Sequence, residues 1–234
     1  MALLALAAGS LMAQSKWEFN TGADLQSRYV WRGQPLGGEG LSLQPGASVA
    51  WNGLQLGVWG AYNIGISEYQ ELDFTLSYTF LDEMLTLQVT DYSFPVLWGG
   101  YRYFDYAANH VMEAGVLFSV PKTNLGIGIY TNFYGADATT MEGNLVYSTY
   151  AELTYTQPWE AQHTEFDFAV GAALNGKQGY SFYGNDGFGL VNISIGATRT
   201  LEVSPSLKLP VYGRLIANPV ADKMFLVCGT RIEL

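Results

Sequence analysis

The sequence has few charged residues. Asp, Glu, Lys and Arg make up only 14% of the 234 residues, whereas a typical soluble domain carries about 25%. Hydrophobic residues nevertheless reach 49%, which argues against an ordinary soluble protein with a Lys- and Glu-rich surface. The formal net charge is −10, and no nucleic-acid partner is expected because phosphate binding needs clustered Lys and Arg.

Cysteine and histidine are nearly absent. The single cysteine, Cys228, cannot form an intramolecular disulfide, and the sequence has no zinc-binding pattern. A serine nucleophile needs a base, usually histidine, and only His110 and His163 are present. We expect His163 beside a short turn and His110 on an outward face at the rim. The sequence therefore predicts no catalytic, metal or cofactor site and no enzyme.

No hydrophobic run is long enough for a transmembrane helix, which needs about 18 or more apolar residues. The one continuous apolar stretch, residues 2–12, is followed by Ala13-Gln14-Ser15. This order predicts a signal peptide over residues 1–13 and export through the periplasm. No basic residue precedes the stretch, so a buried N-terminal core segment is the alternative. Residues 14–234 are expected to form one domain.

The sequence does contain long stretches in which apolar and polar residues alternate. Over residues 17–32 the apolar face carries Trp17, Phe19, Leu25 and Trp31. Strict period-two alternation predicts a strand. Its length exceeds the usual five or six residues and suits a tilted transmembrane strand of about nine to eleven. The pattern returns near residues 72–80, 125–133, 166–174 and 207–215.

The connections between these stretches alternate between short and long, as in outer-membrane barrels. Asn52-Gly53 is a strong hairpin signal, and long Gly- and Tyr-rich stretches cover residues 33–40, 95–109, 135–144 and 175–187. We therefore predict an all-β fold, a single antiparallel transmembrane β-barrel of about twelve strands, with ten or fourteen as alternatives. The strands are expected at residues 17–32, 41–51, 54–63, 71–81, 84–94, 110–120, 125–134, 145–157, 163–174, 188–200, 206–216 and 223–234. Cys228 would then face lipid.

Several short motifs resemble a known family. Residues 27–33 read SRYVWRG and are followed by PGASV at 45–49, LQLGVW at 54–59, ELD at 71–73 and DYSFP at 91–95. This order resembles the TorF-like family of small outer-membrane porins over residues 23–95, and the MltA-interacting protein family shares the Arg-Gly ending of the first strand. The resemblance implies a pore or scaffold in the bacterial outer membrane and supplies no catalytic residues.

Charged residues on the polar face are expected to line the lumen, because a charge on the lipid face is costly. Closure of the barrel would bring the first and last strands together. The expected inward set is Glu18, Asp24, Arg28, Arg32, Asp73, Glu113, Glu152, Glu165, Asp167, Lys208, Arg214, Arg231 and Glu233.

Two arrangements of these charges remain open. They could form a salt-bridged plug, or they could line a water-filled passage with some preference for cations. Twelve strands fall between barrels filled by side chains and open channels, and inward Gly57, Gly115, Gly128, Gly171 and Gly196 either widen the lumen or allow closer packing. The expected function is a narrow porin for passive diffusion of small solutes. The alternatives are a closed structural or surface-recognition barrel and a lipid-modifying enzyme.

An aromatic loop is the other candidate site. Trp98, Tyr101, Arg102 and Tyr103 lie close together in one long connection. Tyr and Trp beside Arg suit stacking against a sugar or a protein partner. The alternative is that they belong to the aromatic girdle at the membrane surface, with outer-membrane lipid as the partner.

Overall fold

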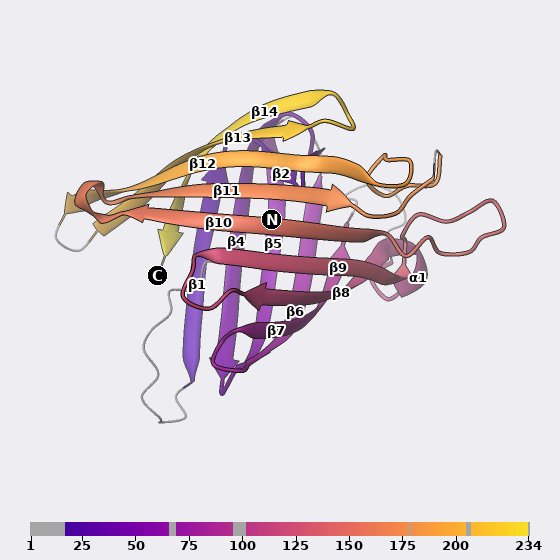
Figure 1. The fold of residues 1–234 in the computed structure, drawn as a ribbon, viewed down its shortest axis with the longest axis horizontal. Helices are drawn as coiled ribbons and strands as arrows, with labels where there is room; N and C mark the ends of the chain where they lie inside the picture. The colour runs from indigo at the N-terminus through magenta and orange to yellow at the C-terminus, as the bar shows by residue number, and fades with distance from the viewer. Residues whose placement is uncertain (1–16, 66–68, 96–101, 178, 205–206, 234) are drawn as a thin grey trace.

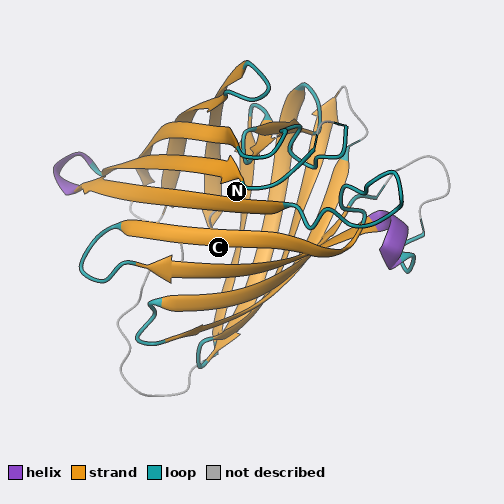
Figure 2. Ribbon diagram, turned by 45° about the vertical axis from the view of Figure 1, so that its right-hand side comes forward, coloured by secondary structure: helices purple, strands orange, loops and turns teal. Residues whose placement is uncertain are grey.

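The protein is a closed antiparallel β-barrel of twelve strands (Figures 1 and 2). The structure, a computed structural model, describes residues 17–65, 69–95, 102–177, 179–204 and 207–233. The expected signal segment, residues 1–13, lies outside them. The barrel strands are β1(Glu18–Gln26), β4(Gly40–Trp51), β5(Leu54–Gly65), β6(Gln70–Phe80), β7(Leu85–Ser93), β8(His110–Ser119), β9(Leu125–Gly135), β10(Thr149–Trp159), β11(Thr164–Ala173), β12(Gly189–Ser204), β13(Leu207–Asn218) and β14(Lys223–Glu233).

The barrel closes through β1, which pairs with both β4 and β14. All other barrel strands pair with their neighbours along the chain. The predicted all-β class, the antiparallel order and the count of twelve are confirmed. Among the described residues, no helix is long and apolar enough to cross a membrane.

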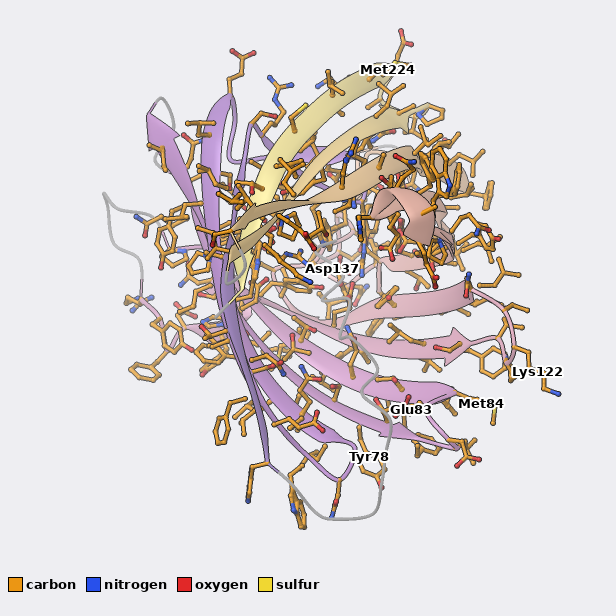
Figure 3. All side chains as sticks on the ribbon, turned by 90° about the vertical axis from the view of Figure 1, so that its left-hand side faces the viewer. Tyr78, Glu83, Met84, Lys122, Asp137 and Met224 are labelled. Carbon is orange, nitrogen blue, oxygen red and sulfur yellow. The ribbon has the colours of Figure 1, made fainter. Side chains whose placement is uncertain are left out.

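The two ends of the barrel differ. One rim carries tight turns, including the Asn52-Gly53 turn, whose positive φ angles of 48° and 82° fit the type I′ hairpin that the dipeptide predicts. Figure 3 labels Glu83, Met84 and Lys122 in neighbouring turns of this rim. The other rim carries the long connections and the short helix α1(Tyr106–Asn109) (Figure 2). We call these the short-turn rim and the long-loop rim.

Apolar side chains project outward between the rims. Leu56 on β5, Leu76 on β6 and Ile129 on β9 are 52%, 51% and 48% exposed. Aromatic pairs stack on the outer face near the short turns, with ring centroids 5.9 Å apart for Trp17 and Trp51. The outer surface of the barrel is therefore a broad apolar belt with aromatic residues at its edge.

The first predicted strand is wrong in its second half. The alternation over residues 17–32 predicts one continuous strand, but β1 ends at Gln26 and the chain then forms a separate hairpin from β2(Tyr29–Trp31) and β3(Gln34–Leu36). Arg32 and Gly33, with φ angles of 46° and 75°, make the tight turn between them. Period-two alternation marks a strand but does not say which sheet the strand joins.

The hairpin lies inside the barrel, where it forms part of a core. Tyr29 and Trp31 are buried, although the alternation placed them on the lipid face. They pack with Tyr130 of β9, Tyr150 of β10 and Tyr183 of the β11–β12 connection. The larger of the two buried hydrophobic clusters in the described residues is thus a mainly aromatic cluster within the lumen, on the side of the long loops.

Smaller differences concern the ends of two strands. The strand predicted at residues 145–157 begins only at Thr149, because the preceding residues belong to the long connection that contains Asp137. The strand predicted at 188–200 continues to Ser204. Cys228 lies on the outward face of β14 and is exposed, as expected.

Candidate functional site: a plugged lumen with two cavities

Arg32, at the turn of the hairpin, is held by the barrel wall. Its guanidinium donates to both carboxylate oxygens of Glu113 on β8, at 2.5 and 2.9 Å, and to the hydroxyl of Tyr183 at 2.7 Å. Tyr92 of β7 donates to the same carboxylate at 3.0 Å. Arg32 and Glu113 are both almost fully buried. A charge-assisted, two-pronged hydrogen bond of this kind fixes orientation as well as position.

Aromatic rings surround the same guanidinium. The Arg32 Cζ atom lies 4.4 Å from the ring centroid of Trp31, 4.3 Å from that of Tyr130 and 4.5 Å from that of Tyr150. Cations over aromatic faces are stabilised more strongly when water is excluded. Burial raises the pKa of the Tyr183 hydroxyl above its ordinary value, so this group stays neutral and can accept the hydrogen bond from Arg32.

Inward glycines leave room for the tyrosine rings. A Cβ atom on Gly128 would meet the ring of Tyr130, and one on Gly171 would meet the ring of Tyr150. The Tyr130 ring therefore packs over Gly128 of its own strand, β9, and the Tyr150 ring packs over Gly171 of the neighbouring strand, β11. Of the two alternatives for the inward glycines, closer packing holds at these positions.

The tip of the hairpin touches the wall on the far side of the lumen. Asn218, at the end of β13, donates through Nδ2 to the carbonyl of Gly33 at 3.1 Å. A Cβ atom on Gly33 would overlap the backbone carbonyl of Val191 on β12. The hairpin thus spans the lumen from β8 to β12 and β13, and we call it the plug (residues 29–36).

A cavity of about 850 Å³ lies between the plug and the short-turn rim. Its lining reaches from Val30 and Arg32 of the plug to Glu160 and His163 in the turn after β10. We call this cavity the vestibule. Like the sequence prediction, the structure places His163 at the short-turn rim.

The walls of the vestibule carry opposite charges. Glu152, Glu165 and Asp167 lie on β10 and β11, and Lys208 and Arg214 lie on β13. Between these walls, β12 contributes uncharged residues such as Ser194, Thr198 and Thr200. A small polar molecule in the vestibule would therefore meet carboxylates on one side and cations on the other.

Two ion pairs join strands around the vestibule. Arg231 of β14 donates to both carboxylate oxygens of Asp24 on β1, each at 3.0 Å, across the seam that closes the barrel. The Arg214–Asp167 pair is longer, at 4.0 Å. The predicted lumen residues Asp24, Glu152, Asp167, Lys208, Arg214 and Arg231 all line this cavity.

Arg32, Asp73 and Glu113, also in the predicted lumen set, are instead buried around the plug. Arg28 lies in the connection between β1 and the plug, with its guanidinium 3.7 Å from Glu39 and over the ring of Phe225. It is absent from the lining of the vestibule.

A second, smaller cavity of about 90 Å³ lies beside Trp31 of the plug. Its lining contains Glu71, and the lining residues of the two cavities have no member in common. Within the described part of the chain, separate sets of residues therefore line the two cavities.

The aromatic loop is only partly described. Trp98 and Tyr101 lie outside the described residues. Arg102 is exposed and forms an ion pair with Asp105 at 2.8 Å, and the ring of Tyr103 packs against His110. Nothing in these contacts assigns a ligand to the loop.

His110 lies at the long-loop end of β8, at the rim as expected, but the residues packed over it bury its side chain fully. Its Nδ1 lies 2.7 Å from Asp91 Oδ1, and its Nε2 lies 2.6 Å from the carbonyl oxygen of Tyr103. Tyr103 and Tyr106 cover the ring. Because its two nitrogens lie against a carboxylate oxygen and a backbone carbonyl oxygen, the ring joins β7 to the loop and anchors it.

Sequence reasoning missed the aromatic residues of the plug site, namely Tyr29, Trp31, Tyr130, Tyr150 and Tyr183. A usable signal was Gly33 directly after Arg32 inside an otherwise regular alternation, because glycine is favoured in tight turns. Another was the inward tyrosine pair on β9 and β10, each beside an inward glycine.

No group of three or more His, Cys, Asp or Glu side chains in the described residues is arranged to hold a metal ion. No protein-family model matches the sequence, and no curated protein matches it.

Proposed function

We propose that this chain is an integral barrel of a bacterial outer membrane, with its short turns in the periplasm and its long loops outside. An even number of antiparallel strands, short turns on one rim only and an apolar outer belt support the proposal, because these features characterise such barrels. Aromatic pairs such as Trp17 with Trp51 and Trp159 with Phe166 suit the membrane interface. The resemblance to TorF-like porins agrees with this placement and stays a prediction.

The lumen of this barrel is closed at rest. The observation that carries this proposal is the Arg32–Glu113 pair, which fixes the plug across the lumen between two separate cavities. Among the functions that the sequence left open, the geometry therefore favours a closed structural or surface-recognition barrel over a freely open porin. The anchoring role of His110 gives no support to a lipid-modifying enzyme.

A plugged channel that opens is the second candidate. The two strands of the plug form backbone pairing with each other and with none of the twelve wall strands. The plug is therefore held by side-chain contacts such as Arg32 with Glu113, and by the hydrogen bond from the Asn218 side chain to the backbone carbonyl of Gly33. Such contacts can be released without breaking the barrel. The charged vestibule would then become the inner half of a passage for small polar solutes.

Solute release from proteoliposomes tests the proposal. Vesicles that contain the wild-type protein should retain a trapped small sugar as well as protein-free vesicles do. The Arg32→Met variant, which loses the pair with Glu113, should release the sugar if the plug is movable and retain it if the barrel is permanently closed. Rapid release by the wild-type protein would overturn the closed barrel and restore the open porin.

A further inference from the structure

The interior around the plug holds more negative than positive groups. Five buried carboxyl groups lie on this side of the barrel, and Arg32 is the one buried cation among the described residues there. Glu113 is paired with Arg32, and Asp137 and Glu152 accept hydrogen bonds from neighbouring groups. Burying a carboxylate without a cation or enough donors is costly. Glu71 and Asp73 also accept hydrogen bonds, but they lie at successive inward positions of β6 with no cation of the described residues paired to either, so a further cation would stabilise them.

Glu71 lines the smaller cavity beside the plug. It is only 2% exposed, and its carboxylate accepts hydrogen bonds from the hydroxyls of Tyr69, at 2.6 Å, and of Tyr29. Asn132 lines the same cavity, is 1% exposed, and its Oδ1 atom has no hydrogen-bond partner among the described residues. Asp73 is the next inward residue along β6, and its buried Oδ1 atom likewise has no hydrogen-bond partner among the described residues.

The remaining walls of this cavity are mostly aromatic. Trp31, Tyr92, Phe94 and Phe182 line it, and Trp31 stands edge-on to both Tyr92 and Phe182, with ring centroids 5.7 and 6.1 Å apart. Aromatic walls beside a carboxylate favour a cation that is weakly hydrated, such as an ammonium bearing methyl groups. The volume of about 90 Å³ corresponds to about three water molecules, which suits one such head group.

We propose that this cavity binds a small organic cation of the alkylammonium or quaternary ammonium class, with Glu71 as its counter-charge. Phe182 belongs to the long β11–β12 connection and is only partly buried, so the ligand enters from the long-loop rim. The site is separate from the vestibule, and it exists while the plug is in place, because Trp31, Gln34 and Leu36 of the plug line it.

Calorimetric titration of the purified protein with choline tests the proposal. A maltoside detergent is required, because phosphocholine detergents carry the same head group. The matched probe is the analogue of choline in which carbon replaces the quaternary nitrogen, since it keeps the shape and removes the charge. Choline should bind at least about tenfold more tightly than this analogue, because a desolvated cation–π contact is worth that factor or more.

Variants locate the site. Glu71→Gln keeps the size of the side chain and an acceptor for Tyr69, and it should weaken choline binding about tenfold or more. Glu142→Gln, the same change at an exposed position in a long loop, should leave it unchanged. If Glu71→Gln does not fold, Phe182→Leu at the half-exposed wall should show the same loss. Three results would overturn the proposal. The wild-type protein could fail to bind choline, it could bind the two probes equally well, or Glu71→Gln could bind choline as tightly as the wild type. Where Glu71→Gln does not fold, unchanged binding in Phe182→Leu takes the place of the third result.

Discussion

Arg32 and Glu113 meet inside the barrel although 81 positions separate them in the chain. Arg32 is at the tip of the plug, and Glu113 is on β8, whose neighbours on either side are β7 and β9. This one pair ties an element that belongs to no wall strand to the wall itself. The stability of the plug and the closure of the lumen therefore depend on the same contact.

Removal of one partner should cost more than removal of both. Glu113→Leu leaves the buried Arg32 guanidinium without its carboxylate, and we expect it to lower the free energy of unfolding by about 3–5 kcal/mol. The double variant Arg32→Met/Glu113→Leu should recover a substantial part of this loss. Urea unfolding in detergent micelles measures both. A double variant less stable than Glu113→Leu alone would contradict the pair as the anchor.

A side chain at Gly33 should displace the plug. In Gly33→Ala the new methyl group would overlap the carbonyl of Val191, so the hairpin must leave the wall. Trypsin should then cleave after Arg32, which is buried in the wild-type protein. Gly184→Ala is the matched control, because Gly184 also has a positive φ angle but its Cβ would meet nothing. Equal protection of Arg32 in both variants would show that the tip contact does not hold the plug.

The barrel could be predicted from the sequence because its outer surface imposes a simple rule. Every strand must present apolar residues to one side, so the alternation in segments such as 72–80 can be recognised without knowing which strands lie beside it. The turn at Asn52-Gly53 was equally local, since its backbone angles suit few other residues.

The plug could not be predicted in the same way. Tyr29 and Trp31 keep the alternation of β1, and a hairpin inside a barrel buries the same residues that a lipid-facing strand would expose. Only the long-range partners of these residues, such as Glu113 for Arg32 and Val191 for Gly33, distinguish an internal hairpin from a lipid-facing strand. The alternation of apolar and polar residues carries no information about such partners. The inward charges of the vestibule could be predicted from the sequence because their strands alternate regularly. The aromatic contacts around Arg32 could not, because they come from three different elements.

The seam between β1 and β14 should depend on its internal ion pair. The two strands pair from Gly22↔Glu233 to Gln26↔Gly229, and Ser27 donates its backbone N–H to the Cys228 carbonyl just beyond them. Arg231 with Asp24 adds two hydrogen bonds across the seam. Arg231→Met should speed amide hydrogen exchange in β1 and β14. Lys208→Met should have little effect, because its pair with Glu202 is exposed and 4.0 Å long. Unchanged exchange in Arg231→Met would mean that backbone pairing alone closes the barrel.

Loss of the His110 ring should free the loop that covers it. The ring joins Asp91 on β7 to the backbone of Tyr103, so His110→Ala removes both contacts. Trypsin should then cleave faster after Arg102, which is exposed but close to this anchor. Asp91→Ala should give a smaller increase, and His163→Ala, at the opposite rim, should give none. Equal cleavage rates in all three variants would argue against an anchoring role.

The most direct test of the closed lumen is the current that single barrels carry in a planar lipid bilayer. The wild-type protein should insert without discrete conductance steps. A variant in which a Gly-Ser segment of equal length replaces residues 29–36 should show steps, because it removes the contacts that run from Glu113 on β8 through Arg32 and Gly33 to Val191 on β12. Steps of equal size in both proteins would contradict the account, since the plug would then not close the barrel.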